Sequence, residues 1–410
     1  MVSAANVAAL PGRRAWCLIE RDSRPALRAA AASICKGAFA ATVAASRIRR
    51  DALFRGDAVE QRAGLRRADA MHNDRPGSAS FSPSRRDLLR LAVLAPAALA
   101  VGMLPGCAKP PRFDGSFIQP WRSHLDLSAQ DWQQHMALAQ RLGCRQIVVQ
   151  WAGLYGSGGD ADWSLPDSTL QLIFSTAAAA GLQVRVGLPY HSGWWKALQA
   201  QDLATLDAFL ALTLDHARAY LQTAPWSRQA NFDGWYLPYE LEQFHWAQDA
   251  RQQRLCSWLA ALCAAASASA GTEKVTAIST YFSRLQTSGS LPQLWNRILD
   301  QVPLRPMVQD GVGVAGLDNL DGVDPLLAAL RARQVAFDVV VELFEELPSS
   351  AADGSHFQAQ TADAARIQQQ LAWAQRSGAA GIFAFALDPW LSQDSPRAQA
   401  LRRQWRTGRQ

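Results

Sequence analysis

The chain has few cysteines and lacks several short motifs that hold metals, redox centres or phosphates. Its six cysteines form no CxxC pair, and neither HExxH nor GxxxxGK[ST] occurs. Cys256 and Cys263 lie on one helical pattern, roughly 10 Å apart along the axis, which is too far for a disulfide. These absences disfavour a disulfide scaffold, a metal site or a P-loop. We expect no cofactor and no metal ion, and we interpret Cys144, Cys256 and Cys263 as small buried apolar residues.

Charge is divided unevenly along the 410 residues. Residues 1–106 contain 17 Lys and Arg against 8 Asp and Glu, a net of +9, and the remainder contains 24 against 27, a net of −3, which together give the overall +6. The basic excess therefore precedes the region that we expect to fold. A nucleic-acid partner is not expected.

Residues 84–107 have the layout of an export signal. Arg85 and Arg86 precede an apolar run at 91–103, which is too short to span a bilayer as a stable helix, and the segment ends in LPGC at Cys107. This layout resembles a twin-arginine signal joined to a lipobox. The resemblance implies export of the folded protein and a lipid anchor on Cys107, at the periplasmic face of the cell envelope and on the outer membrane rather than the inner.

An unusually long stretch of chain precedes this signal. Residues 1–70 are rich in Ala and Arg without helical or strand periodicity, so we interpret them as a non-native or disordered extension and place the true start at Met71. On this interpretation 71–106 is the signal peptide, 107–115 is a lipidated tether, and 116–410 is the folded domain.

Within that domain, short apolar or β-branched runs alternate with longer segments of helical period. The predicted strands are residues 117–121, 146–151, 182–189, 232–240, 274–281, 305–310, 337–343 and 381–387. The predicted helices are residues 129–142, 167–180, 203–221, 246–268, 292–301, 325–334, 362–377 and 395–405. Ser128 is placed as a helix N-cap, and Gly143, Gly181 and Gly378 as helix ends. Eight evenly sized units favour an α/β fold that is a single (β/α)₈ TIM barrel, with an open doubly wound sheet as second choice.

Glutamate is concentrated at two predicted strand ends. From Cys107 onward the chain contains six, and five of them lie at the ends of the fourth and seventh strands. Two carboxylates facing each other across a barrel mouth can cleave a glycosidic bond, one as acid and base and the other as nucleophile. The simpler alternative is that Glu240 and Glu342 form structural pairs with arginines such as Arg122 or Arg284. We interpret Glu345 and Glu346 as a solvated loop face, and Glu242 as a supporting or surface group.

Three segments carry a more specific resemblance. GWYLPYE at 234–240, QDGVG at 309–313 and VELFE at 341–345 are similar to motifs of a bacterial exported TIM-barrel family classed as a domain of unknown function. The resemblance extends to the clan-A (β/α)₈ glycoside hydrolases, which implies Glu240 as acid/base and Glu342 as nucleophile. The clan commonly places Asn before the acid/base, where this chain has Tyr239. Either Gln309 or Asp310 therefore contacts the sugar 2-hydroxyl in place of that Asn, or the substrate and the chemistry differ from the usual pattern of the clan.

Polar and aromatic residues at the predicted strand ends form the candidate substrate site. Tryptophans could stack on sugar rings while amide, carboxylate and imidazole groups meet hydroxyls. The candidates are Gln119, Trp121, Gln150, Trp151, Tyr190, His191, Tyr239, Tyr281, Gln309, Asp310 and Trp390. Trp194, Trp195, Trp235 and Trp246 lie near the same ends, with Trp235 and Trp246 interpreted as core residues. His191 is either a substrate ligand or a capping residue.

The sequence thus predicts a monomeric glycoside hydrolase that acts on an extracytoplasmic oligo- or polysaccharide with retention of configuration. A retaining mechanism implies carboxyl groups about 5 to 5.5 Å apart, and roughly 6.5 Å or more would favour inversion. The rival prediction is a non-catalytic sugar-binding or scaffold lipoprotein in the assembly or export of a surface polysaccharide. The absence of Asn before Glu240 keeps that alternative open.

Overall fold

The structure is a computed structural model that describes residues 112–156, 162–347 and 358–407. The predicted extension, the signal peptide, Cys107 and most of the tether lie outside the described residues. Within the described ranges, no helix combines the length and the hydrophobicity needed to cross a bilayer.

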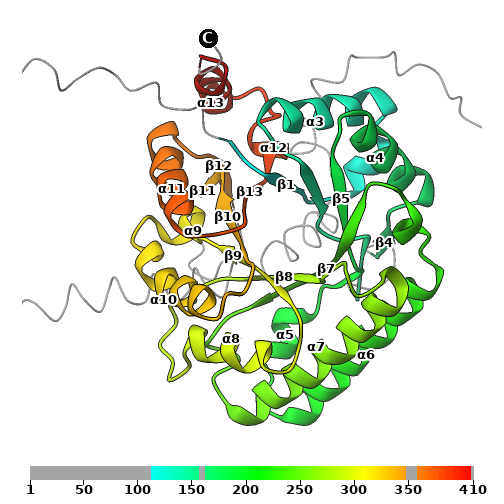
Figure 1. Cartoon of the computed structure of the whole chain (residues 1–410), viewed down its shortest axis with the longest axis vertical. Helices are drawn as coiled ribbons and strands as arrows, with labels where there is room; N and C mark the ends of the chain where they lie inside the picture. The colour runs from blue at the N-terminus through cyan, green and yellow to red at the C-terminus, as the bar shows by residue number, and fades with distance from the viewer. Residues whose placement is uncertain (1–111, 157–161, 348–357, 408–410) are drawn as a thin grey trace, which may run out of the picture.

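Eight parallel strands close into a barrel, as Figure 1 shows in a view down the short axis of the molecule. The strands are β1 (Gly115–Ile118), β2 (Gln146–Val149), β5 (Gln183–Gly187), β7 (Phe232–Leu241), β8 (Ala277–Thr280), β9 (Arg305–Gln309), β10 (Asp338–Glu342) and β13 (Gly381–Phe385). Each pairs with its neighbour in the chain order of barrel strands, and β13 closes the ring against β1. The predicted TIM barrel is confirmed.

A long helix follows each barrel strand and covers the outside of the ring (Figure 1). The helices are α3 (Ala129–Arg141), α4 (Asp167–Ala179), α6 (Leu203–Thr223), α7 (Asp249–Ala270), α8 (Leu291–Leu299), α10 (Asn319–Ala332), α11 (Ala364–Arg376) and α13 (Pro396–Thr407). Ser128 caps α3 by accepting from Asp131 N, and Gly143, Gly181 and Gly378 have positive φ after their helices, as predicted.

One helix boundary was predicted wrongly. The expected start at Pro325 follows from the preference of proline for the first helical turn, but α10 begins at Asn319 and holds Pro325 in its interior. Proline inside a helix removes one backbone hydrogen bond and crowds the preceding turn, but the leucines that follow it, Leu326, Leu327 and Leu330, pack into the core. Their burial keeps the segment helical on both sides of Pro325.

Side chains alternate between the inside and the outside of the barrel wall. The inner cluster contains Phe117, Val148, Tyr236, Ala277, Met307, Val340 and Phe383. The outer faces pack against the helices in a much larger core, which includes Cys144, Cys256 and Cys263 as free, buried thiols. The interpretation of these cysteines as apolar core residues is confirmed. Because the inner cluster fills the barrel, only residues beyond it toward the strand ends can form a site.

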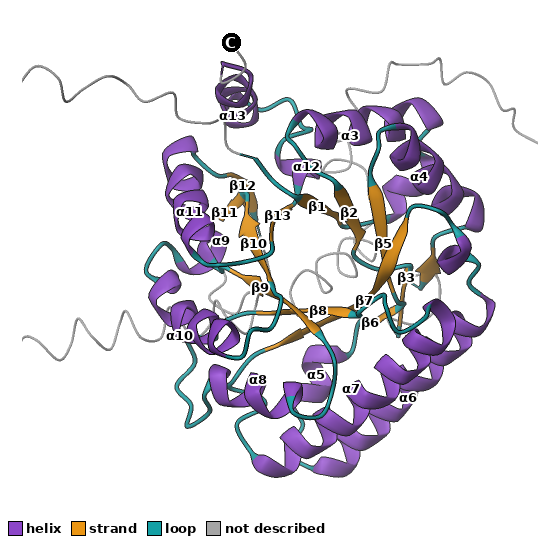
Figure 2. Ribbon diagram, viewed as in Figure 1, coloured by secondary structure: helices purple, strands orange, loops and turns teal. Residues whose placement is uncertain are grey.

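Short elements that the sequence did not reveal are inserted after the barrel strands. Figure 2 shows a small sheet of β3 (Gly153–Tyr155), β4 (Trp163–Ser164) and β6 (Tyr190–His191) beside the barrel. A hairpin of β11 (Phe344–Glu346) and β12 (Ala359–Thr361) follows β10. The remaining short elements are η1 (Arg122–Asp126), α5 (Trp194–Gln199), η3 (Trp226–Arg228), α9 (Val312–Ala315) and α12 (Leu387–Trp390).

Close packing between β2 and β5 gives a stability prediction. A Cβ added at Gly187 would lie 2.0 Å from the carbonyl oxygen of Gln150. We expect Gly187→Ala to lower the free energy of unfolding by about 3 kcal/mol, since the strands cannot separate without disturbing the barrel. Gly271→Ala, where φ is +82° and no atom lies within 4 Å, should cost about 1 kcal/mol from backbone strain alone. Equal losses in denaturant titrations would contradict the proposed clash.

Candidate active site

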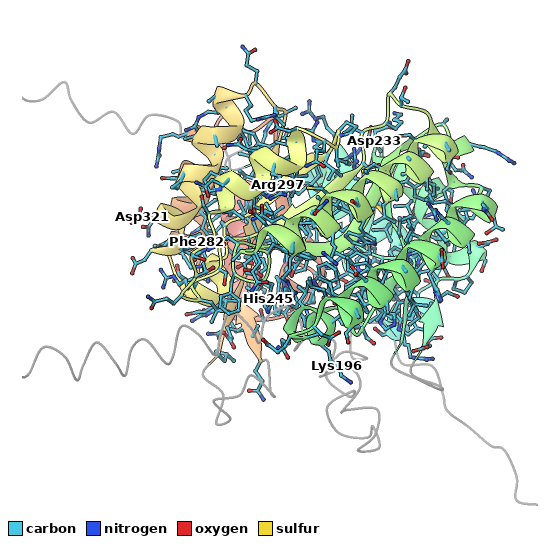
Figure 3. The ribbon with its side chains drawn as sticks, turned by 90° about the horizontal axis from the view of Figure 1, so that it is seen from below. Lys196, Asp233, His245, Phe282, Arg297 and Asp321 are labelled. Carbon is cyan, nitrogen blue, oxygen red and sulfur yellow. The ribbon has the colours of Figure 1, made fainter. Side chains whose placement is uncertain are left out.

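Two glutamates lie at one mouth of the barrel. Glu240 is near the end of β7, the fourth barrel strand, and Glu342 ends β10, the seventh. Side-chain alternation places both on the inner face, with Tyr236 and Val340. In the side view of Figure 3, Asp233 in β7 lies near one end of the barrel, and His245 and Phe282, which follow β7 and β8, lie toward the other. The two carboxylates thus occupy the strand ends at which the sequence placed them.

Strand β9 and the segment that follows it provide one hydrogen bond to each of the two carboxylates. Gln309 Nε2 donates to Glu240 Oε1 at 2.7 Å. The backbone N–H of Gly313, in the short helix α9 after β9, donates to Glu342 Oε2 at 2.7 Å. Each carboxylate is therefore oriented by a donor fixed to the barrel wall and keeps its second oxygen for other contacts.

The turn after β9 also matches GxGxxG, the glycine pattern of dinucleotide-binding turns, at residues 311–316. Its backbone N–H groups have other partners here: Val312 N donates to Asp310 Oδ1 and Gly313 N to Glu342 Oε2. The helix α9 occupies four residues of this segment, Val312–Ala315. Since a phosphate needs free N–H groups at a helix start, this turn binds carboxylates of the protein itself.

The mouth carboxylates are not members of structural ion pairs. At the opposite end of the barrel, Arg305 contacts Asp338 at 2.6 Å and Arg185 contacts Asp233 at 3.2 Å. Among the described residues no such pair involves Glu240 or Glu342, and Arg284 pairs with neither. The structural alternative that the sequence left open is therefore contradicted for both glutamates.

Glu240 is in an environment that favours its protonated form near neutral pH. Its side chain is half-buried at the mouth. Burial raises the pKa of the carboxyl from 4.5 to about 7, although the hydrogen bond from Gln309 acts in the opposite direction. A carboxylic acid of this kind can donate a proton to a leaving group at neutral pH.

Glu342 is more deeply buried and has a second carboxylate, Asp310, behind it. Asp310 Oδ1 accepts from Glu342 N at 3.4 Å, and Asp310 Oδ2 accepts from Gln370 Nε2 at 2.6 Å. Arg366 on α11 donates to the carbonyl oxygen of Glu342 at 3.0 Å and to Gln370 Oε1. Asp310, Gln370 and Arg366 thus fix the end of β10 from outside the barrel wall.

Opposing effects act on the ionisation of this pair. Burial, and then repulsion by the Asp310 carboxylate, raise the pKa of Glu342 well above its ordinary range, against the effects of Gly313 N–H and the Arg366 guanidinium. Burial likewise raises the pKa of Asp310 to about 6. Because the two buried carboxylates repel each other, the free protein favours a form in which the pair holds one proton.

The structure changes the predicted role of several residues. Asp310 is fully buried, with both oxygens accepting from the protein, so it lies behind the site and cannot reach a sugar hydroxyl. Tyr239 points away from the mouth, because it neighbours inward-facing Glu240 on the strand, and packs on Trp194 and Trp258. The position that holds Asn in the clan is therefore a core position here.

The predicted tryptophan cleft is largely absent. Trp151, Trp194, Trp195, Trp235 and Trp246 are buried in the core, which confirms the interpretation of Trp235 and Trp246 but not a rim of seven. Tyr190 and Tyr281 are buried as well. Trp121 and Trp390 remain partly exposed at the ends of β1 and β13. The periodicity of the sequence did not distinguish rim from core, because the short helices and small sheets at the strand ends have aromatic cores of their own.

A buried histidine and aspartate link the two exposed tryptophans. Trp121 N donates to His124 Nδ1 at 3.0 Å, and His124 Nε2 contacts Asp388 Oδ2 at 3.1 Å, in the segment that ends at Trp390. Asp388 is also near His135, at 3.6 Å. Hydrogen bonding and the two histidines lower the pKa of Asp388 despite its burial. This contact fixes the loops after β1 and β13 to each other.

The amide candidates line the inner face of the mouth. Gln119 is half-buried, and Gln150 and Gln309 are more than nine-tenths buried, as is the carboxylate Glu342. The side-chain oxygen of Gln150 has no hydrogen-bond partner within the described part of the chain. A buried acceptor without a partner is costly, so Gln150 is a strong candidate to bind a hydroxyl.

Two histidines near the mouth have partners within the protein, and His191 has the capping role that the sequence offered as one alternative. His191 Nδ1 accepts from Gly193 N at 2.9 Å, and its ring packs between Tyr155 and Phe209, a local capping role. His245 Nδ1 contacts Glu242 Oε1 at 2.6 Å. Glu242 is completely buried and accepts from Phe244 N and His245 N, so the surface alternative for it is wrong. In the ranges that the structure describes, no group of three or more His, Cys, Asp or Glu could hold a metal ion.

Three residues of the site were missed by sequence reasoning. Arg366 and Gln370 are on α11, one helical turn apart, and His124 is in η1. The spacing of Arg366 and Gln370 by four residues indicates a shared helix face, but nothing in the sequence shows that this face covers Glu342. Glu345, predicted as a solvated loop residue, is partly exposed and pairs with Arg397.

The model of a family described as "Domain of unknown function (DUF4434)" matches residues 113–400, so the chain belongs to that family. It is 28% identical over 249 residues to the uncharacterized protein YbcH of Escherichia coli (strain K12), which covers 56% of this chain and 76% of that protein.

Among solved structures, the chain is similar to a putative alpha-L-fucosidase from Bacteroides thetaiotaomicron VPI-5482. The match has a TM-score of 0.54 and 14% sequence identity, and it covers 73% of this chain and 96% of the other. At this identity the likeness establishes a shared barrel fold.

Proposed function

We propose that this DUF4434 family member is a glycoside hydrolase in which Glu240 is the general acid/base and Glu342 the nucleophile. The observation that carries the proposal is the pair of inward-facing carboxylates at the ends of β7 and β10, each held by one donor from the β9 side. Glu240 is accessible and its pKa is raised to about 7, as a general acid requires. That the similar barrel is described as a putative alpha-L-fucosidase is consistent with this chemistry.

The proposed reaction has two steps. For the attack, the proton that Glu342 and Asp310 share is on Asp310, so that Glu342 is a carboxylate. Protonated Glu240 gives its proton to the glycosidic oxygen while a Glu342 carboxylate oxygen attacks the anomeric carbon, which breaks the bond to the leaving sugar and forms a glycosyl ester. Glu240, now a carboxylate, then takes a proton from water, which attacks the same carbon and releases Glu342. Gly313 N–H stays bonded to the other Glu342 oxygen throughout, and configuration is retained.

The proposed substrate is an oligo- or polysaccharide outside the cytoplasm. Partly exposed Trp121 and Trp390 offer stacking faces, and Gln119 and Gln150 offer amide groups to hydroxyls. The twin-arginine signal and Cys107 would deliver a monomeric, lipid-anchored enzyme to the periplasmic face of the outer membrane. No cofactor takes part in the proposed reaction.

A second candidate function is a sugar-binding scaffold lipoprotein without turnover. The specific observation in its favour is Tyr239, which is turned into the core where the clan presents Asn to the sugar. Gln309, the other candidate for that contact, is bonded to Glu240. On this view the barrel binds a surface polysaccharide during assembly or export.

A screen of purified envelope and extracellular polysaccharides separates the two functions. We expect new reducing ends from at least one polymer, and proton NMR of the first products should show the anomeric configuration of the substrate. Products of the opposite configuration would contradict the nucleophilic role of Glu342. Oligosaccharide binding without any cleavage would favour the scaffold.

A further inference from the structure

A polar groove lies on the Glu342 side of the barrel mouth. It has a volume of about 1060 Å³ and is formed by the segments that follow β7, β8, β9 and β10. Its lining includes Gln243, residues 282–287, residues 312–316 and Glu345. Phe282, which lies toward the mouth in Figure 3, belongs to this lining. Its volume is slightly above the usual range for small-molecule sites, which is roughly 300 to 1,000 Å³.

The groove is continuous with the nucleophile side of the site. Gly313 lines the groove and donates its backbone N–H to Glu342 Oε2. Arg366 also lines the groove and donates to the Glu342 carbonyl oxygen. A sugar chain cut at Glu342 could therefore extend into the groove, so the inference below depends on the proposed function.

One wall of the groove is held rigidly. Gln243 Nε2 donates to the Ser283 carbonyl at 2.7 Å, and Ser283 N donates to Gln243 Oε1 at 3.1 Å. Thr287 Oγ1 donates to the Gln243 carbonyl. These bonds join the segments after β7 and β8. Arg284 lies between the two fixed residues, Ser283 and Thr287, so its backbone is held in place.

Arg284 is unusual among the charged residues of the groove. Three carboxylates, Asp318, Glu345 and Glu346, line the groove with Arg284 and Arg366. Arg366 is bonded to Gln370 and to two carbonyl oxygens, and Glu345 is paired with Arg397. Half-buried Arg284 makes no hydrogen bond or ion pair with any residue that the structure describes. A guanidinium on a firm wall that no described carboxylate of the protein pairs with is suited to a planar, bidentate carboxylate of a ligand.

We propose that this groove binds a sugar bearing a carboxylate, and hence that the substrate is an acidic polysaccharide of the uronic-acid class with Arg284 as the residue that recognises its charge. Gln286 provides a direct test of the charge argument. It lines the same groove, is exposed, and lies two residues from Arg284.

The experiment measures binding by isothermal titration on a Glu342→Gln background, so that turnover does not interfere. The probes are alginate and polygalacturonate oligosaccharides, neutral xylo-oligosaccharides of equal length, and sulfated oligosaccharides. We expect Arg284→Gln to weaken uronate binding about tenfold, as for one lost charge-assisted pair. Gln286→Lys should strengthen it and Gln286→Glu weaken it, and neutral probes should not respond. Arg228→Gln, an exposed arginine in η3, is the matched control.

Equal affinity for neutral and uronate probes, or no response to Arg284→Gln and both Gln286 variants, would overturn the inference. So would binding confined to sulfated probes. Melting temperatures of each variant exclude unfolding as a cause. Because binding is measured without turnover, uronate binding by a wild-type protein that cleaves none of the probes would leave the groove assignment intact and count against the hydrolase.

Discussion

Glycan cleavage should fall by about 10⁴-fold or more when Glu342 is replaced by Gln, because the nucleophile is lost and no neighbour can replace it. Asp310, the nearest carboxyl, is turned away behind the strand and occupied by Val312 N and Gln370. The Gln side chain keeps an oxygen for the Gly313 N–H, so oligosaccharide binding should persist. Reducing-end release and isothermal titration on the same preparation measure the two effects separately.

Glu342→Ala allows a sharper version of this test. With an aryl glycoside of the substrate sugar, added azide should restore part of the activity and yield a glycosyl azide of inverted configuration, since azide enters the space that the carboxylate leaves. Glu273→Gln, which removes an exposed glutamate between α7 and β8, is the control and should retain full activity. A Glu342→Gln protein that still cleaves at more than about a tenth of the wild-type rate would exclude covalent catalysis by this residue.

The barrel could be predicted because each unit carries its signals locally. Strand runs, helical period and glycines such as Gly143 and Gly181 report on neighbouring residues, and all eight units followed. Pro325 misplaced one helix start, because the burial of the leucines after it is a tertiary effect. The short elements β3, β6 and β11 were missed because two or three residues are too few to show a period.

The site was predictable only in part. The two glutamates were found because glutamate is scarce and sits at strand ends. The direction of each side chain at a strand end was not available, and this is why Tyr239 and Asp310 were assigned to the substrate although one faces the core and the other lies behind Glu342. Arg366 and Gln370 act across a helix–strand contact that no spacing encodes.

Glu240→Gln should make protein stability less sensitive to pH, which can be measured without knowing the substrate. The pKa of Glu240 is 4.5 as an ordinary glutamate and about 7 in the fold. Between these values the folded state binds more protons than the unfolded state, so the free energy of unfolding falls as pH rises. The contribution is fully present below about pH 4.5 and is lost as pH rises through about 7.

The amide in Glu240→Gln cannot ionise, so the stability of the variant relative to wild type should rise over this window, by up to about 3 kcal/mol and by less to the extent that solvent reaches the half-buried carboxyl. Urea titrations at several pH values from 4.5 to 8 measure the difference, and Glu273→Gln should give one that does not change with pH. Parallel curves for wild type and Glu240→Gln would mean that Glu240 is ionised at neutral pH in the free protein. Its role as the proton donor would then fail. If instead the stability of Glu240→Gln relative to wild type rises with pH, and activity declines above about pH 7, the same Glu240 proton affects both folding and catalysis.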